Sequence, residues 1–276
     1  MLHSLLAAAQ TRLGLEDHPW LDDAVERAAV FALAFLGVDL FFCRGPLRGP
    51  LLRLFSQGGQ SKESQRRFLS QLAAKLIGIV FLSAIMPLAF QALADPALAG
   101  GDRFRDTTPV SWRMVEIGSG YFLYDIIICL LKFSDNGFEF MLHAVVCCSV
   151  FLTATAKGVM HYYGAAFLMW ELSTPLMYVR WLMLKAGLGK SALMPLVNVA
   201  FMLVFFGCRN VWGPIMTLRF WRDGGLQLAS SAPALPHTAI HVIRVMAIAL
   251  NCLNTYWFSQ MVRIAVKGGK PKQKAV

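Results

Sequence analysis

The sequence predicts an all-α polytopic membrane protein. Of its 276 residues, 57% are hydrophobic and 15% are charged, whereas about 25% of the residues of an ordinary soluble domain are charged. The mean hydropathy of +0.54 agrees with this class. The apolar residues gather in runs of about 19 residues or more, which is enough for a helix to cross a bilayer. The net charge of +10 comes from basic residues that cluster between these runs, so it indicates an anionic membrane face rather than nucleic acid.

Seven apolar runs are the predicted transmembrane helices. The first, at residues 25–43, is short and carries Asp39. It must direct membrane insertion, because the apolar part of residues 1–10 is too short for a cleavable signal peptide and no basic start precedes it. The other six are expected at residues 68–93, 113–133, 138–156, 160–185, 193–218 and 238–266. Residues 219–237 are expected to be the most flexible loop, because glycine, serine and proline recur there.

The lysines and arginines between the runs predict the orientation of the chain. Thirteen lie on the side that holds the odd-numbered loops and the C-terminal tail, against eight on the other side, which favours a cytosolic C-terminus. The chain then divides into three parts. Residues 1–67 hold a luminal tail, the first helix and a basic cytosolic loop, residues 68–266 form one domain of six helices, and residues 267–276 are a basic cytosolic tail.

The last five residues contain a candidate cellular address. Lys272 and Lys274 stand at the fifth and third positions from the end, which is the K-x-K-x-x form of a dilysine signal that returns proteins to the endoplasmic reticulum. Such a signal works only in the cytosol, where the charge count independently places it. A basic tail that lies near anionic lipid explains the same lysines, so both interpretations stay open.

Polar side chains interrupt the apolar runs at helical spacing. In the third run Tyr121 and Asp125 are one turn apart and share a face. His143 is the only ionisable side chain in the central part of the fourth run. In the fifth run Thr174 and Tyr178 follow Glu171 at helical spacing and form one polar stripe with it. Pro175 lies in the middle of that run and is expected to kink the helix there.

Two further runs carry polar stripes. Asn198 and Arg209 lie eleven residues apart in the sixth run, on nearly the same helix face, and Arg244 begins a stripe in the seventh. A charged residue costs roughly 2.5 to 3.5 kcal/mol at the centre of an isolated spanning helix, so these stripes are expected to face the interior of the bundle. Arg180 lies half a turn away from Glu171 on a straight helix. It is therefore expected at the cytosolic end of its span, near an anionic headgroup or a carboxylate.

Neither a disulfide framework nor a metal site is predicted. The six cysteines form no C-x-x-C pair and are expected to pack as small hydrophobic side chains. A zinc hydrolase built from His143, His161, His237 and His241 is conceivable, but no ligand spacing supports it.

Several motifs resemble the TLC domain, which ceramide synthases, translocating-chain-associating membrane proteins and a group of small TLC-domain-containing proteins share. They are GYFLYD at 120–125, FMLH at 140–143, LMWELSTPLMYVRW at 168–181, VNVAFMLVFFGCRNVWGP at 197–214 and LNTYWF at 253–258. The ELSTP and RW pieces are most similar to the type called TLC domain-containing protein four. The resemblance covers about residues 68–266 and implies a barrel of six helices around a central cavity that is open to lipid. One additional span precedes this barrel.

The resemblance implies catalytic residues and includes one departure. Ceramide synthases carry a His-His pair with which they transfer an acyl group from coenzyme A to a sphingoid base; here the pair reads Leu142-His143. Their acidic cluster is represented by Trp170-Glu171 alone. His143 with Glu171 or Asp125 could still act as a general base, with acyl-coenzyme A as co-substrate. The candidates for lining a lipid cavity are Tyr121, Thr174, Tyr178, Arg180, Asn198 and Arg209.

Three classes of function follow. The preferred class is a lipid-handling protein of the endoplasmic reticulum whose cavity holds a fatty acyl or sphingoid chain, with or without turnover. The second is an acyltransferase of the ceramide synthase type that uses His143 as base. The third is a seven-span receptor or transporter, against which stand the lack of paired outer cysteines, of receptor motifs and of an inverted repeat. The expected partners are membrane lipids, with acyl-coenzyme A or a sphingoid base; no nucleic acid and no bound cofactor is expected.

Overall fold

The computed structural model describes residues 19–55, 59–131 and 133–266, and these ranges are helical without any β-strand. Five helices in the described ranges are long and apolar enough to cross a membrane. The all-α membrane class predicted from the sequence is therefore confirmed, while a total of seven spans stays a prediction. The five are Lys62–Ala94, Pro109–Leu131, Gly137–Lys157, Leu193–Ala229 and His237–Val266.

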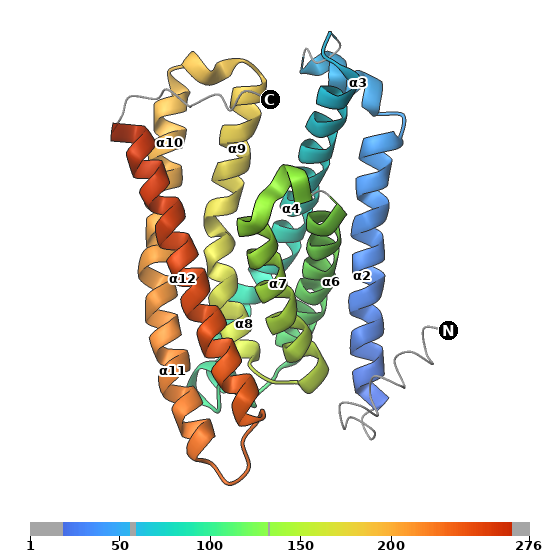
Figure 1. Ribbon diagram of the computed structural model, residues 1–276. Coiled ribbons are helices and arrows are strands. Elements are labelled where there is room, and N and C mark those ends of the chain that lie inside the picture. The colour runs from blue at the N-terminus through green and yellow to red at the C-terminus, as the bar shows by residue number, and fades with distance from the viewer. Residues whose placement is uncertain (1–18, 56–58, 132, 267–276) are drawn as a thin grey trace.

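The helices form a bundle of roughly parallel rods that alternate in direction (Figure 1). The first half of the bundle consists of α2 (Pro19–Arg44), α3 (Arg48–Leu54), α4 (Lys62–Ala94), α5 (Pro96–Gly100), α6 (Pro109–Leu131) and α7 (Phe133–Lys157). The second half consists of α8 (His161–Leu168), η1 (Met169–Ser173), α9 (Thr174–Lys185), η2 (Leu188–Lys190), α10 (Leu193–Phe205), η3 (Phe206–Trp212), α11 (Gly213–Ala229) and α12 (His237–Val266). The α9–α10 turn and α3 lie at one end of the bundle, and the α11–α12 turn lies at the other (Figure 1).

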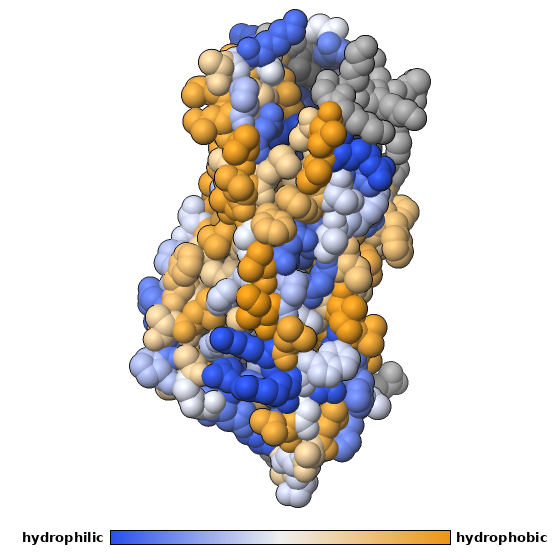
Figure 2. Space-filling view, turned by 90° about the vertical axis from the view of Figure 1, so that its left-hand side faces the viewer, coloured by the Kyte–Doolittle hydropathy of each residue, from blue (hydrophilic) through white to orange (hydrophobic). Residues whose placement is uncertain are grey.

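Large apolar side chains cover the outside of the bundle. On α10, Leu193, Leu196, Val199 and Leu203 are all exposed and recur every three or four residues along one face. Figure 2 shows hydrophobic residues over much of the side that carries α10, α11 and α12. A surface of this kind is stable against lipid tails and unstable against water.

Polar contacts attach α2 to the rest of the bundle. The Asp39 carboxylate, which interrupts the first apolar run, is buried and accepts a hydrogen bond from the Tyr124 hydroxyl of α6 at 3.3 Å. Near the other end of α2, Arg27 pairs with the buried carboxylate of Glu116 at 2.8 Å. Both acidic groups therefore have partners on a neighbouring helix, as buried polar groups require.

Glycines on α6 allow close helix contacts in this half of the bundle. A Cβ added at Gly118 would stand 2.5 Å from the Phe151 ring of α7, and one at Gly120 would stand 2.4 Å from Phe31 of α2. Small residues at such contacts let helix backbones approach closely within membranes. Tyr121 follows on the same helix and stacks on Phe81 of α4 with ring centroids 3.7 Å apart.

The fifth predicted span is broken rather than kinked. Residues 169–173 form the 3-10 helix η1, and Pro175 lies in the first turn of a new helix, α9, instead of in the middle of one helix. Proline fits this position because its missing N–H has no partner in a first turn. The expectation of a proline kink in a continuous helix is therefore corrected to a change of helix type.

The prediction of a flexible loop at residues 219–237 is wrong for most of these residues. The chain stays helical to Ala229, and a short connection precedes His237. Helix α11 buries one face here, including Phe220 and Asp223, and this burial outweighs the low helix propensity of Gly224 and Gly225.

Gly118→Ala should destabilise the protein, because the new methyl group must displace the Phe151 ring. Overpacking of this kind costs about 1 to 3 kcal/mol, which thermal unfolding of the purified protein in one detergent will detect. Gly37→Ala on α2 is the matched control, since a Cβ there meets nothing within 4 Å. The control should be at least as stable as the wild type. Equal unfolding midpoints for the two variants would contradict the close α6–α7 contact.

Candidate functional site

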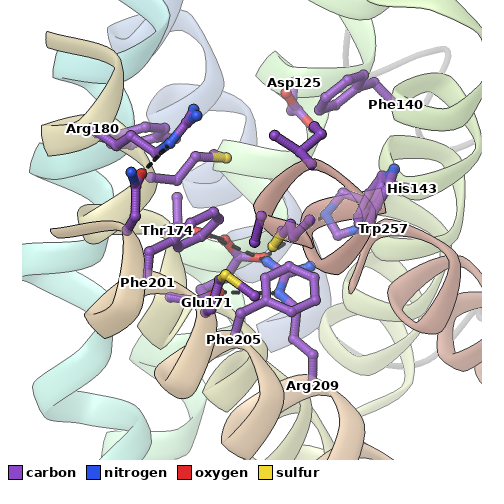
Figure 3. A pocket seen from close by; sticks show the side chains of 18 of the residues that line it. Asp125, Phe140, His143, Glu171, Thr174, Arg180, Phe201, Phe205, Arg209 and Trp257 are labelled. Carbon is purple, nitrogen blue, oxygen red and sulfur yellow. Dashed lines mark hydrogen bonds and ion pairs between the residues drawn. The ribbon is translucent and has the colours of Figure 1, made fainter. Parts of the chain in front are cut away.

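A cavity of about 460 Å³ lies among α6, α7, α9, α10 and α12. Its walls are mainly apolar, and Figure 3 shows the polar side chains that reach it from several helices. All nine residues that the sequence suggested as catalytic or cavity-lining border it: Tyr121, Asp125, His143, Glu171, Thr174, Tyr178, Arg180, Asn198 and Arg209. What each of them does there stays a prediction.

An ion pair between Glu171 and Arg209 forms the polar centre of the cavity. Arg209 Nη2 lies 3.2 Å from Glu171 Oε1, and both side chains are largely buried. The Thr174 hydroxyl donates a hydrogen bond to the other carboxylate oxygen, Oε2, at 2.7 Å. Arg209 also donates from Nη1 to the Asn254 side chain at 3.1 Å. The charge of each partner is thus balanced inside the bundle, as a buried charge requires.

The break in the helix supplies another acceptor for Arg209. In an α-helix the N–H of Thr174 would bond to the Trp170 carbonyl, but in η1 it bonds to the Glu171 carbonyl instead. Pro175 has no N–H that could compete for that carbonyl. The Trp170 carbonyl accepts a hydrogen bond from the Ser173 hydroxyl at 3.3 Å, and Arg209 Nε donates to the same oxygen at 2.9 Å.

Arg209 itself lies in a π-helical segment, η3 (Phe206–Trp212), between α10 and α11. One residue more per turn changes the direction of the side chains that follow, and such segments occur mostly at functional sites. Arg209 is 6% exposed, and its guanidinium also lies over the Phe205 ring, 5.1 Å from the centroid.

His143 approaches the ion pair from α7. Its Nε2 atom lies 3.9 Å from Glu171 Oε1, which is longer than a hydrogen bond. Glu171 therefore interacts with a protonated imidazole only as a nearby charge and does not fix its orientation by a direct bond. The Cys147 sulfur lies 3.6 Å from Nε2, one turn further along the helix.

Asp125 borders the same cavity but stands apart from these two groups. Among the described residues, no hydrogen bond or ion pair joins it to His143 or Glu171, and Figure 3 shows it near Phe140 rather than beside Glu171. The structure therefore brings His143 and Glu171 close together, with Asp125 on another part of the wall.

Arg180 and Asn198 form a second polar contact in the cavity. Arg180 Nε donates to Asn198 Oδ1 at 2.7 Å and so links α9 to α10. Of the two partners expected for Arg180, no carboxylate of the described residues pairs with it, and contact with an anionic headgroup stays a prediction. The described residues also pair Glu171 with Arg209, a contact that the helix-by-helix pattern did not predict. The only signal for it was that two opposite charges stand near the middle of successive apolar runs.

Leu142 does not face the cavity. It packs against Val146, Trp170 and Leu250, so the position of the first histidine in the family pair is part of an apolar contact between helices. A smaller void of about 50 Å³ continues beyond His143, and its lining is almost wholly apolar. The two hollows share Phe122, His143 and Glu171.

The remaining histidines of the conceivable zinc set lie elsewhere. His161 is buried, with Nδ1 2.8 Å from the Ser111 hydroxyl, while His237 and His241 are exposed at the start of α12. Within the described ranges, no three histidine, cysteine or acidic side chains stand close enough to hold a metal ion. Lys272 and Lys274 lie outside the described residues.

The amino-acid sequence is similar to those of known proteins. A family profile described as the TLC domain matches residues 72–263. The chain is 34% identical to an uncharacterized TLC domain-containing protein of Saccharomyces cerevisiae over 226 residues, which cover 76% of this chain and 68% of that protein. It is 30% identical over 181 residues to Topoisomerase I damage affected protein 4 of the same yeast. It is 29% identical over 170 residues to Protein CLN8 of Canis lupus familiaris.

The last two matches each cover 60% of this chain, and they cover 63% of the first of these proteins and 57% of the second. The chain thus spans less than two-thirds of the length of these two relatives.

Arg209→Met should destabilise the protein strongly, because it leaves the buried Glu171 carboxylate without its cation. Removing one partner of a buried pair costs about 3 to 5 kcal/mol. Unfolding of the purified protein in detergent measures this loss. In the double variant Arg209→Met/Glu171→Gln most of the stability should return, since no charge is left unbalanced.

Arg219→Gln is the matched control for the loss of an arginine, because Arg219 is exposed on α11. It should unfold like the wild type. If the double variant is no more stable than Arg209→Met, the two charges are not coupled.

Proposed function

The chain belongs to the TLC domain family, and we propose that it is a lipid-handling membrane protein that holds a fatty acyl or sphingoid chain in its cavity. The observation that carries the proposal is a cavity of about 460 Å³ within the membrane-spanning bundle. Small-molecule sites commonly measure about 300 to 1,000 Å³ and combine apolar walls with a few polar groups. By taking up such a chain the protein would influence the lipid composition of its membrane.

The lining of the cavity fits an amphiphile better than a polar solute. Its apolar side chains include Phe140, Phe201, Met202, Phe205, Met261 and Ile264. A hydrocarbon chain that covers them makes close dispersion contacts without leaving any polar group unsatisfied. Polar groups around Glu171 and at Arg180, together with Asp125 on another part of the wall, can form hydrogen bonds with a hydroxyl, amine or carbonyl of the same ligand.

The charges around Glu171 also favour a ligand whose nearby polar group is neutral or zwitterionic. Glu171 is already balanced by Arg209 and bonded by Thr174. An additional net charge in this position would lack a counterion and would cost free energy on burial. We therefore expect the hydrogen-bonding part of the ligand that reaches Glu171 and His143 to carry no net charge.

An acyltransferase activity is the second candidate, and the position of His143 favours it. The imidazole borders the cavity, 3.9 Å from Glu171 Oε1, where it could take a proton from a lipid amine or hydroxyl while acyl-coenzyme A supplies the acyl group. We prefer lipid binding to acyl transfer because His143 retains only the second imidazole of the family's His-His pair. Leu142 stands in place of the first and packs in an apolar contact.

We also propose residence in the endoplasmic reticulum with a cytosolic C-terminus, on the basis of Lys272 and Lys274 and the charge distribution of the loops. Unchanged reticulum staining of a tagged chain after both lysines become serine would contradict the role of these lysines.

Met261→Trp should reduce the amount of lipid that copurifies with the protein, because the larger side chain fills part of the cavity. Quantitative lipid mass spectrometry on the protein purified in a mild detergent measures the ratio of lipid to protein. Val262→Trp is the matched control, because this neighbouring residue on α12 is exposed and does not line the cavity. Lipid retention that is equal in both variants, or absent from the wild type, would contradict the proposal.

His143→Ala separates lipid binding from turnover. The wild-type protein is incubated with a long-chain acyl-coenzyme A and a set of lipid amines and alcohols, and acylated products are sought by mass spectrometry. We expect lipid binding to persist in His143→Ala. A product that forms with the wild type and with His241→Ala, but not with His143→Ala, would establish the acyltransferase function in its place. His241 is a suitable control because it is exposed and distant from the cavity lining.

A further inference from the structure

Arg244 on α12 is a buried cation that the cavity does not involve. Its residue is 6% exposed, and its guanidinium lies over the Trp221 ring of α11, 4.6 Å from the centroid. Nη2 donates to the Trp221 carbonyl. Nε is enclosed and has no acceptor. No carboxylate of the described residues lies within ion-pair distance of it.

The acidic group nearest to it along α11 is already shared. Asp223 pairs with Arg103 at 3.1 Å and with Arg222 at 3.2 Å, and it accepts a hydrogen bond from the Tyr163 hydroxyl at 2.6 Å. Arg103 Nε is also enclosed without an acceptor. Three guanidinium groups therefore surround this segment of α11 with one carboxylate among them, which leaves a surplus of positive charge.

The position of Arg244 along its helix corresponds to a membrane boundary. Arg244 and Arg263 are 19 residues apart on the continuous helix α12, which is about 28 Å at 1.5 Å per residue. The hydrocarbon core of a bilayer is about 30 Å thick. When Arg263 lies at one headgroup layer, Arg244 lies at the other, at the end of the bundle that carries the α11–α12 turn (Figure 1).

The protein surface at the expected membrane boundary near Arg244 is suited to a lipid headgroup. Figure 2 shows a band of hydrophilic residues across the lower part of an otherwise largely hydrophobic side of the bundle. Trp221, which is 44% exposed, provides an amphipathic ring of the kind that is enriched at the membrane interface. The ring covers one face of the Arg244 guanidinium.

Two glycines let the guanidinium lie against α11. A Cβ at Gly224 would stand 3.3 Å from Arg244 Nε, and one at Gly225 would stand 3.4 Å from Nη2. Nη1, in contrast, forms no hydrogen bond and is not among the enclosed nitrogens. The guanidinium is thus held against α11 on one side, and Nη1 is a nitrogen of this group that is not fully enclosed.

We propose that the Arg244 guanidinium binds the phosphate of a membrane phospholipid. A phosphate oxygen accepts a charge-assisted hydrogen bond from Nη1 and supplies a negative charge. Asp223 does not supply this charge, because it pairs with Arg103 and Arg222. Arginine suits this ligand because its weakly hydrated, planar cation forms strong bonds to phosphate. Basic pockets between membrane helices bind lipid headgroups in the same way. This site is separate from the cavity around Glu171 and does not depend on what that cavity holds.

Native mass spectrometry of the full-length protein in detergent tests the proposal. The protein is titrated with palmitoyl-oleoyl-phosphatidylglycerol, with the diacylglycerol that has the same two chains but no phosphate, and with inorganic phosphate. We expect phosphatidylglycerol to bind about tenfold more tightly than diacylglycerol, and Arg244→Gln to lose this difference, because one charge-assisted hydrogen bond is worth about this factor.

Two variants provide matched controls. Arg263→Gln removes an exposed arginine at the other end of α12, and Glu171→Gln alters the central cavity; both should keep the preference for phosphatidylglycerol. Loss of the preference in Glu171→Gln but not in Arg244→Gln would place the lipid in the cavity and overturn the proposal. An unchanged preference in Arg244→Gln would overturn it as well.

The remaining outcomes are also decisive. If inorganic phosphate binds at Arg244 and displaces phosphatidylglycerol, the site takes a free anion and the lipid assignment is wrong. If Arg244→Gln does not fold, Trp221→Leu, which removes the ring over the guanidinium, replaces it, and a retained preference for phosphatidylglycerol in that variant would contradict the site. A wild-type protein that binds diacylglycerol as tightly as phosphatidylglycerol would refute it directly.

Discussion

The pairing of Glu171 with Arg209 inside a membrane-spanning bundle is the interaction on which the site depends. A carboxylate or a guanidinium alone in hydrocarbon is costly, and each is acceptable here because the other lies 3.2 Å away. The local backbone is adapted to this pair. The 3-10 segment before Pro175 carries the Trp170 carbonyl that accepts from Arg209, and the π-helical segment around Arg209 sets the direction of its side chain. Two departures from regular helix thus meet at one ion pair.

The same requirement organises the rest of the bundle. Polar groups in its apolar helices have partners on other segments of the bundle: Asp39 has Tyr124, Glu116 has Arg27, and Asp223 has Tyr163 and Arg103. Each contact joins segments that are distant in sequence. Because lipid tails are as apolar as the helix surfaces, such bonds and close small-residue contacts hold membrane helices together where the hydrophobic effect cannot. Arg244 differs, since no carboxylate of the described residues lies within ion-pair distance of it, and we propose a lipid phosphate as its counterion.

The cavity follows from the way these contacts divide the helices. Helices α9, α10 and α12 meet α6 and α7 around the ion pair, and the space beside it is bordered by aromatic and methionine side chains. A mainly apolar cavity whose central ion pair carries no net charge suits a hydrocarbon chain with a hydrogen-bonding group. His143 stands where it could contact that group, yet beyond hydrogen-bond distance from Glu171. Lipid binding does not need a hydrogen bond between these two residues, whereas a general base oriented by Glu171 would need one.

The sequence by itself determined the helical class, the approximate positions of five long apolar helices and nine of the residues that border the cavity. Hydropathy and helical spacing are local properties, and the spacing of Glu171, Thr174 and Tyr178 places them on one face of an α-helix. Tertiary structure alone decided which of these residues touch. It paired Glu171 with Arg209 and Arg180 with Asn198, kept Asp125 apart, and made residues 219–229 helical where a loop was expected. These outcomes depend on how the helices are rotated against one another and on local 3-10 and π-helical turns, and no pattern within a single run encodes either.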